Sequence, residues 1–151
     1  MDDLLRLKPL LLAFETDYKP LLASGRVCLS LGWNGDAAAL MSQQVPVRYV
    51  IPSEGSQLWE DDWAIAAGTS DPELAHAFVN FMLRPAIAAQ EARYTRYATG
   101  NRAALALLDP HVQKDPAVYP PDEVLRRLES GMPIDAPGQA RREELWHRVR
   151  G

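Results

Sequence analysis

A strand, a helix and a second strand, all predicted in the first third of the chain, constrain its fold most. Residues 27–31 and 47–51 are short β-favourable runs, and each is bounded by glycine, serine or proline residues that favour turns. Between them, residues 36–43 have the pattern of a helix. This order of elements favours an α/β fold.

A long amphipathic helix is predicted after Ser70. Asp71 can cap its first turn, and Pro72 suits the first helical position. Apolar residues then recur at helical spacing and form one stripe, which we expect to face the core. The stripe consists of Leu74, Ala77, Phe78, Phe81 and Met82.

Further helices are predicted along the rest of the chain. Their ranges are 85–94, 101–108 with Asn101 as its cap, 120–129 and 137–150. The last of these has only a narrow apolar stripe, formed by Leu145, Trp146 and Val149. We therefore expect it to pack on a surface supplied by another part of the protein.

The composition is that of an ordinary globular domain, with 47% hydrophobic and 24% charged residues among 151. The net charge of −4 gives no basic surface for nucleic acid. No apolar run approaches the roughly 18 residues of a membrane-spanning helix, and the first residues lack the pattern of an export signal. Cys28 is the single cysteine, and its apolar run predicts a buried, unreactive side chain.

One cluster that can carry chemistry lies where the first predicted strand ends and the first helix begins. Its sequence, LGWNGDA over residues 31–37, occupies the edge at which open α/β sheets usually bind ligands. Trp33 offers an aromatic face there. Spacing alone leaves two roles open for Asp36, which can either cap the helix or contact a ligand.

A second cluster, EGSQLWEDDWAI over residues 54–65, places three consecutive carboxylates between two tryptophans. Two such clusters suit a short organic diamine. Carboxylates offset the desolvation of the ammonium groups, while aromatic faces contact the methylene chain and attract the cations. A solvated acidic turn beside two core tryptophans is the alternative that the composition leaves open.

Catalytic chemistry has no comparable pattern. His76, His111 and His147 are far apart, and none has another histidine or cysteine at the spacing of metal ligands. The sequence contains neither a nucleophile elbow nor a phosphate-binding glycine loop. We therefore expect no enzymatic activity, no cofactor and no metal site.

Five motifs in order give the chain a family resemblance. They are WNGDA at 33–37, PSEG and WED within 52–61, FVNFMLRP at 78–85, YATGNRAA at 97–104 and DPAVYPP at 115–121. With these motifs the chain resembles the C-terminal part of the spermidine/putrescine-binding periplasmic proteins of ABC transporters, and within them the putrescine-binding branch. The order and spacing of the motifs hold over nearly the whole chain.

The resemblance implies five residues that contact a polyamine ligand. Trp33 matches the tryptophan that lines the carbon chain of the amine, and Asp36 matches an aspartate that contacts it. Trp59 and Asp61 match the next ligand motif, in which the aspartate grips an ammonium group, and Tyr97 matches the tyrosine that closes the pocket.

The resemblance also implies an incomplete fold. It predicts a partial type II periplasmic binding protein fold that contains portions of both lobes and lacks the upstream half. Residues 1–61 would belong to the C-terminal lobe, 62–63 to the hinge crossover, 64–130 to the N-terminal lobe, and 131–151 to a linker and a terminal helix that return to the C-terminal lobe. The implied location is the periplasm, and the implied partners are transporter permease subunits.

Two hypotheses about function follow. The first is a polyamine-binding solute-binding protein, present here as a C-terminal piece. The second is a truncated structural or interaction module that binds no ligand. In either case, strands without partners and uncovered apolar faces predict that the chain associates with another copy or rearranges its packing.

Overall fold

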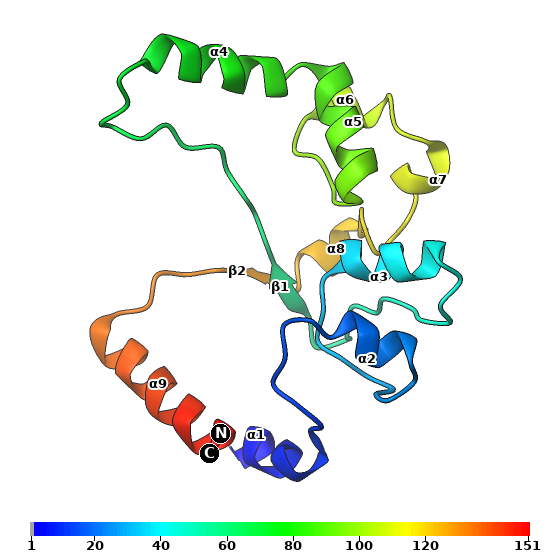
Figure 1. Ribbon diagram of the computed structural model, residues 1–151, viewed down its shortest axis with the longest axis vertical. Helices are drawn as coiled ribbons and strands as arrows, with labels where there is room; N and C mark the ends of the chain where they lie inside the picture. Colours follow the sequence, from blue (N-terminus) through cyan, green and yellow to red (C-terminus); the bar gives the residue numbers. More distant parts are fainter. Residues whose placement is uncertain (1) are drawn as a thin grey trace. The chain divides into compact units, whose positions relative to one another are not determined.

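The computed structural model describes residues 2–151 of this helix-rich chain (Figure 1). The chain divides into two compact units. The first unit combines residues up to Ser30 with Gly131–Gly151, and the second comprises Leu31–Ser130. In the described part of the chain, no helix combines the length and apolar character needed to cross a membrane.

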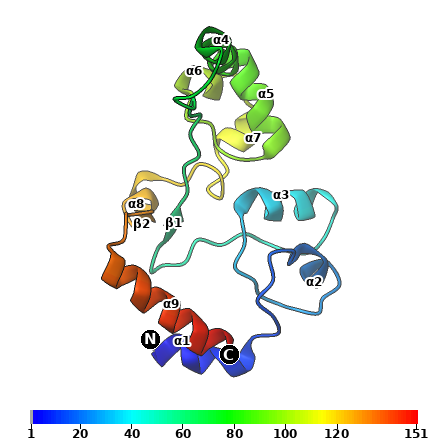
Figure 2. The ribbon, with the colours of Figure 1, turned by 60° about the vertical axis from the view of Figure 1, so that its left-hand side comes forward.

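The first unit pairs segments from the two ends of the chain. Its elements are α1 (Asp2–Leu7), η1 (Lys8–Leu10), α2 (Lys19–Ala23) and α9 (Ala136–Arg150). Helices α1 and α9 lie side by side in both views (Figure 1 and Figure 2). The rings of Phe14 and Trp146 meet edge to face with centroids 5.2 Å apart, and Lys8 Nζ donates a hydrogen bond to the carbonyl of Arg148.

The second unit contains the remaining helices and one small sheet. Its elements are α3 (Asn34–Ser42), β1 (Ser56–Leu58), α4 (Pro72–Met82), α5 (Pro85–Thr95), α6 (Arg102–Leu105), α7 (Pro110–Gln113), α8 (Asp122–Leu125) and β2 (Leu128–Ser130). Strands β1 and β2 pair in parallel, with Ser56 opposite Leu128. The helices α4 to α8 form the crossover that a parallel connection requires.

Small residues form the core of the second unit. Ala88, Ala89 and Ala92 of α5 are buried against Ala104 and Leu108. Because alanine side chains are short, α5 and α6 approach closely, and Leu105, Val112 and Tyr119 pack around them. This core positions the C-terminal end of α5, next to which one predicted site residue lies.

The predicted helix starts are confirmed where local capping determines them. Asp71 accepts a hydrogen bond from the backbone N–H of Leu74 at the start of α4, and Asn101 accepts from two N–H groups at the start of α6. Two predicted helix ends are wrong. Helix α6 stops at Leu105, and the helix predicted over 120–129 stops at Leu125 because the chain then enters β2.

The two predicted strands at 27–31 and 47–51 do not form. Both segments are irregular, and the only strands in residues 2–151 are β1 and β2. A strand persists only when a neighbouring strand pairs with its backbone, and in the described chain β1 and β2 pair with each other and with neither of these segments. The prediction for Cys28 is therefore wrong as well, since its side chain is exposed where no sheet covers the run.

The apolar stripe of α4 is also exposed, in contrast to the prediction that it faces the core. Leu74 is 66% exposed and Phe78 is 48% exposed, although the Phe78 ring makes an edge contact with Trp63. The helix forms because its cap and its periodicity are local. Burial of the stripe needs a second apolar surface packed against α4, and residues 2–151 do not supply one.

Gly55 permits the close approach of β1 to the segment that leads into β2. Its φ of 111° lies in the region that favours glycine. A Cβ atom at this position would lie 2.2 Å from the carbonyl oxygen of Arg127, which is backbone and cannot turn aside. Pairing of the two strands therefore depends on the absence of a side chain at residue 55.

We expect Gly55→Ala to lower the free energy of unfolding by about 1–3 kcal/mol, because it adds both backbone strain and a steric clash. Chemical denaturation monitored by circular dichroism measures this change. Gly68→Ala is the control, since no atom lies within 4 Å of a Cβ built at Gly68. Equal stability of the two variants would contradict the proposed role of Gly55.

Candidate functional site

Two of the predicted site residues, Trp33 and Trp59, are in direct contact. Trp33 occupies the N-cap position of α3 with an extended backbone, and Trp59 directly follows β1. Their ring centroids are 5.3 Å apart with an interplanar angle of 65°. Trp33 is 47% exposed and Trp59 is 56% exposed, so the pair presents aromatic surface to solvent.

The indole of Trp59 orients a third predicted residue. Trp59 Nε1 donates a hydrogen bond of 3.0 Å to Asp61 Oδ1. This bond fixes the carboxylate beside the aromatic pair and leaves its second oxygen available to a ligand. Glu60 and Asp62 are exposed on either side, and none of these three carboxylates has an ion-pair partner within residues 2–151.

Asp36 lies in the first turn of α3, where the partial positive charge of the helix N-terminus stabilises a carboxylate. The N-cap position itself is held by Trp33, whose side chain makes no capping hydrogen bond. A ligand contact of Asp36 stays a prediction. Asp36 is partly buried.

Tyr97 packs on the same turn of α3. A Cβ atom built on Gly35 would lie only 2.7 Å from the Tyr97 Cζ and 2.8 Å from its Cε1. The ring therefore occupies the space that a side chain at residue 35 would fill. This contact places Tyr97 next to the helical turn that carries Asp36.

Four of the five predicted residues thus fall into two groups. Trp33, Trp59 and Asp61 contact one another in the first group, and Tyr97 packs against Gly35 in the second. The first turn of α3 links the groups, because Trp33 is its N-cap residue and the turn includes both Gly35 and Asp36. All of these residues belong to the second unit.

Three further residues, which were not predicted, hold this arrangement in place: Asn34, Gly35 and Arg96. Asn34 Nδ2 donates to the carbonyl of Ala117 at 2.9 Å, and an Arg96 guanidinium N–H donates to the carbonyl of Ala38 at 3.0 Å. Asn34 and Gly35 lie within the WNGDA motif, which offered a signal for them. Arg96 offered none, since its role depends on a contact with a distant helix.

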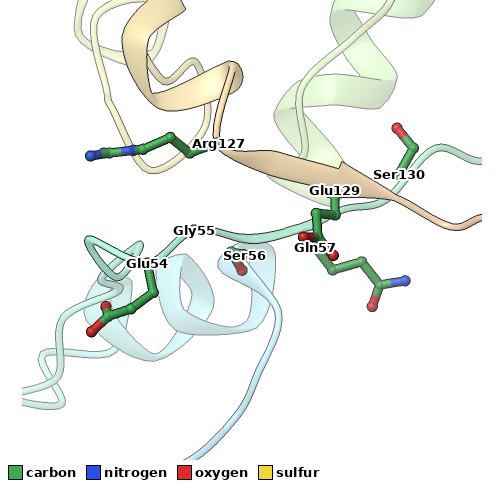
Figure 3. A pocket seen from close by; sticks show the side chains of 7 residues that line it. All are labelled: Glu54, Gly55, Ser56, Gln57, Arg127, Glu129 and Ser130. Atoms are coloured by element: carbon green, nitrogen blue, oxygen red, sulfur yellow. The ribbon is translucent and has the colours of Figure 1, made fainter.

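A separate cavity of about 430 Å³ lies along the strand pair (Figure 3). None of the five predicted residues lines it. Gln57 and Glu129, which are register partners, project to one side of the strands, and Ser130 projects to the other. The cavity is an open hollow beside a two-stranded sheet, so we place the candidate site at the aromatic cluster, where charge and aromatic surface coincide.

Glu54, at one end of this hollow, is the carboxyl group whose environment favours ionisation. The hydrogen bonds that its carboxylate accepts from its own backbone N–H and from the Ser53 hydroxyl hold the pKa of Glu54 below its usual value. The side chain is exposed. Its charge adds to the acidic character of the segment that leads to Trp59.

The chain matches the family of bacterial extracellular solute-binding proteins over residues 12–120, and it therefore belongs to this family. It is 31% identical to the putrescine-binding periplasmic protein SpuD of Pseudomonas aeruginosa, over 97% of this chain and 42% of that protein. It is 37% identical to the spermidine/putrescine-binding periplasmic protein of Escherichia coli, over 85% of this chain and 37% of that protein. The predicted family is confirmed.

A solved structure supports the same fold. The spermidine/putrescine ABC transporter substrate-binding protein PotD from Streptococcus pneumoniae is 31% identical and superposes with a TM-score of 0.86, over 99% of this chain and 46% of that chain. The predicted partial type II periplasmic binding protein fold is confirmed. Of the two predicted outcomes, a rearranged packing is not observed, and association with another copy stays a prediction. The chain spans less than half the length of these relatives.

We expect Gly35→Ala to displace the Tyr97 ring and to lower the free energy of unfolding by about 1–3 kcal/mol. Urea denaturation of the variant and of the unaltered chain measures this loss. In a Tyr97→Ala background, the same substitution should cost clearly less, because only the Thr95 carbonyl oxygen, 3.0 Å from the added Cβ, then stays close, and alanine is favoured over glycine in a helix by about 1 kcal/mol. An equal loss of unfolding free energy in both backgrounds would show that the Tyr97 ring is not the cause of the destabilisation by Gly35→Ala.

Proposed function

We propose that this chain supplies polyamine-binding residues of the extracytoplasmic solute-binding component of an ABC transporter. The observation that carries the proposal is the Trp33–Trp59 pair with Asp61 fixed beside it by the Trp59 indole. Aromatic faces and an oriented, unpaired carboxylate are what a flexible organic cation requires. The names of the relatives, which bind putrescine or spermidine, support this class of ligand.

The proposed binding mode follows from the two groups of the site. One ammonium group of a diamine is held by Asp61, and the methylene chain lies against the rings of Trp33 and Trp59. Asp36, in the first turn of α3, contacts the part of the amine that lies next to this helix. Tyr97 covers the same part of the ligand. The proposal is one of binding rather than catalysis, which agrees with a family of solute-binding proteins.

The described chain leaves this site open to water. Both tryptophans are about half exposed, so a bound cation keeps much of its hydration and gains less from each carboxylate than in an enclosed pocket. We assign residues 1–61 and 131–151 to the C-terminal lobe, 64–130 to the N-terminal lobe, and 62–63 to the crossover between them. A complete site then needs the remainder of both lobes. The proposed location is the periplasm, and the proposed partners are the transporter permease subunits.

We expect Asp61→Asn to weaken putrescine binding about tenfold or more, which corresponds to about 1.4 kcal/mol. Asparagine keeps an oxygen that accepts from Trp59 Nε1 but lacks the charge that balances an ammonium group. Isothermal titration calorimetry at low salt measures the dissociation constant. Glu123→Gln, which removes an exposed charge on α8, is the matched control.

Each outcome of this titration has a definite meaning. Binding that is saturable in the unaltered chain and in Glu123→Gln but weakened in Asp61→Asn supports the proposal. Equal weakening in both variants would assign the effect to net charge alone. Flat heats for the unaltered chain at millimolar putrescine would contradict ligand binding by residues 1–151 and favour the non-binding interaction module.

The exposed face of α4 supports self-association as a second property. Beside the stripe lies an apolar groove of about 410 Å³ between α4 and α5, lined by Phe81, Met82, Ile87, Gln90, Glu91 and Tyr94. Exposed apolar surface of this kind favours association in water. The groove and the stripe together form the surface that we assign to this contact.

We expect the chain to sediment as a species larger than a monomer at micromolar concentration, and Phe78→Glu to shift it to the monomer, because a charge on the stripe opposes its burial. Analytical ultracentrifugation measures both. His76→Glu adds a charge to the same helix away from the stripe and should leave association unchanged. A monodisperse monomer for the unaltered chain would refute self-association.

A further inference from the structure

The side chain of Arg96 ties the C-terminal end of α5 to α3 by a hydrogen bond. It follows the last residue of α5 and adopts a left-handed backbone conformation, with φ 64° and ψ 20°. Its backbone N–H closes α5 by donating to the carbonyl of Ala92. This conformation ends the helix and directs the chain into Tyr97.

The guanidinium of Arg96 reaches the middle of α3. One of its N–H groups donates to the carbonyl of Ala38 at 3.0 Å. A carbonyl oxygen has two lone pairs, so this oxygen can accept from Arg96 in addition to its bond within the helix. A positively charged donor makes the contact stronger than a neutral hydrogen bond.

The contact lies next to the packing of Tyr97 on Gly35. Arg96 and Tyr97 are neighbours in sequence, and Gly35 and Ala38 lie one turn apart on α3. The two residues therefore hold α3 at two points, one through a hydrogen bond and one through ring packing. The same helix begins at Trp33 and carries Asp36, so its position sets the spacing between the two groups of the site.

We propose that Arg96 is a positioning residue that fixes α3 against Tyr97 and thereby sets the geometry of the cation site. The proposal rests on the proposed function for its effect on ligand binding. Arg96 does not touch the ligand in this scheme. It acts through the Tyr97 ring, which its hydrogen bond keeps seated on Gly35.

Arg93 provides a matched comparison on the same helix. Its guanidinium also donates to a main-chain carbonyl, that of Leu107, but this carbonyl lies beyond α6 rather than on α3. Arg93→Met, within α5, and Arg96→Met, at its C-cap, thus each remove one charge and one hydrogen bond of the same kind. Only the second substitution releases α3.

The test uses the 151-residue chain with two measurements. Hydrogen exchange of the peptide that contains α3 is followed without ligand, and the dissociation constant for putrescine is measured by calorimetry. Arg96→Met should raise the hydrogen-exchange rate of α3 about tenfold, and it should raise the dissociation constant for putrescine about tenfold. Both changes are those expected for loss of one charged hydrogen bond. Arg96→Lys, which retains a charged donor, should restore both to within about threefold.

A double-mutant cycle separates positioning from a general structural effect. In a Tyr97→Ala background, Arg96→Met should weaken putrescine binding by less than about twofold further, because the residue through which it acts is already absent. Equal losses for Arg93→Met and Arg96→Met, or a full tenfold loss that persists without Tyr97, would overturn the proposal. If the unaltered chain binds no putrescine, the proposed function fails, and exchange in α3 alone decides whether Arg96 holds the helix.

Discussion

The parallel contact between β1 and β2 is the constraint on which the second unit depends. It joins segments on either side of the whole α4 to α8 crossover, and it is possible only because Gly55 has no side chain where the Arg127 carbonyl approaches. Trp59 directly follows β1. The position of the tryptophan that orients Asp61 therefore depends on a backbone contact outside the candidate site.

Helix α3 connects the packing of the second unit to the residues of the candidate site. Its first turn supplies an aromatic ring and a carboxylate, and its glycine accepts a tyrosine ring from the end of α5. Hydrogen bonds from Asn34 and Arg96 attach it to distant parts of the unit. Contacts between helices therefore set the geometry of the candidate site. The cavity along β1 and β2 is separate from it, since none of the five predicted residues lines that cavity.

The same chain leaves much apolar surface uncovered. A parallel sheet is normally covered on both faces by helices and extended by further strands, whereas this one has two short strands. The exposed stripe of α4 and the irregular runs at 27–31 and 47–51 belong to a fold that spans less than half the length of its relatives. The exposure of the candidate site and the exposure of these apolar surfaces therefore have the same cause: no further strand or helix of the described chain covers them.

The sequence by itself determined the features that depend on neighbouring residues. The cap at Asp71, the cap at Asn101 and the motifs that place the chain in its family all act within a few positions, so they were readable without a structure. Tertiary structure alone decided which segments pair as strands, that Cys28 is exposed, and that Tyr97 rests on Gly35. These outcomes require partners far along the chain, because a strand, a buried stripe or a seated ring is stable only when another segment supplies the opposing surface.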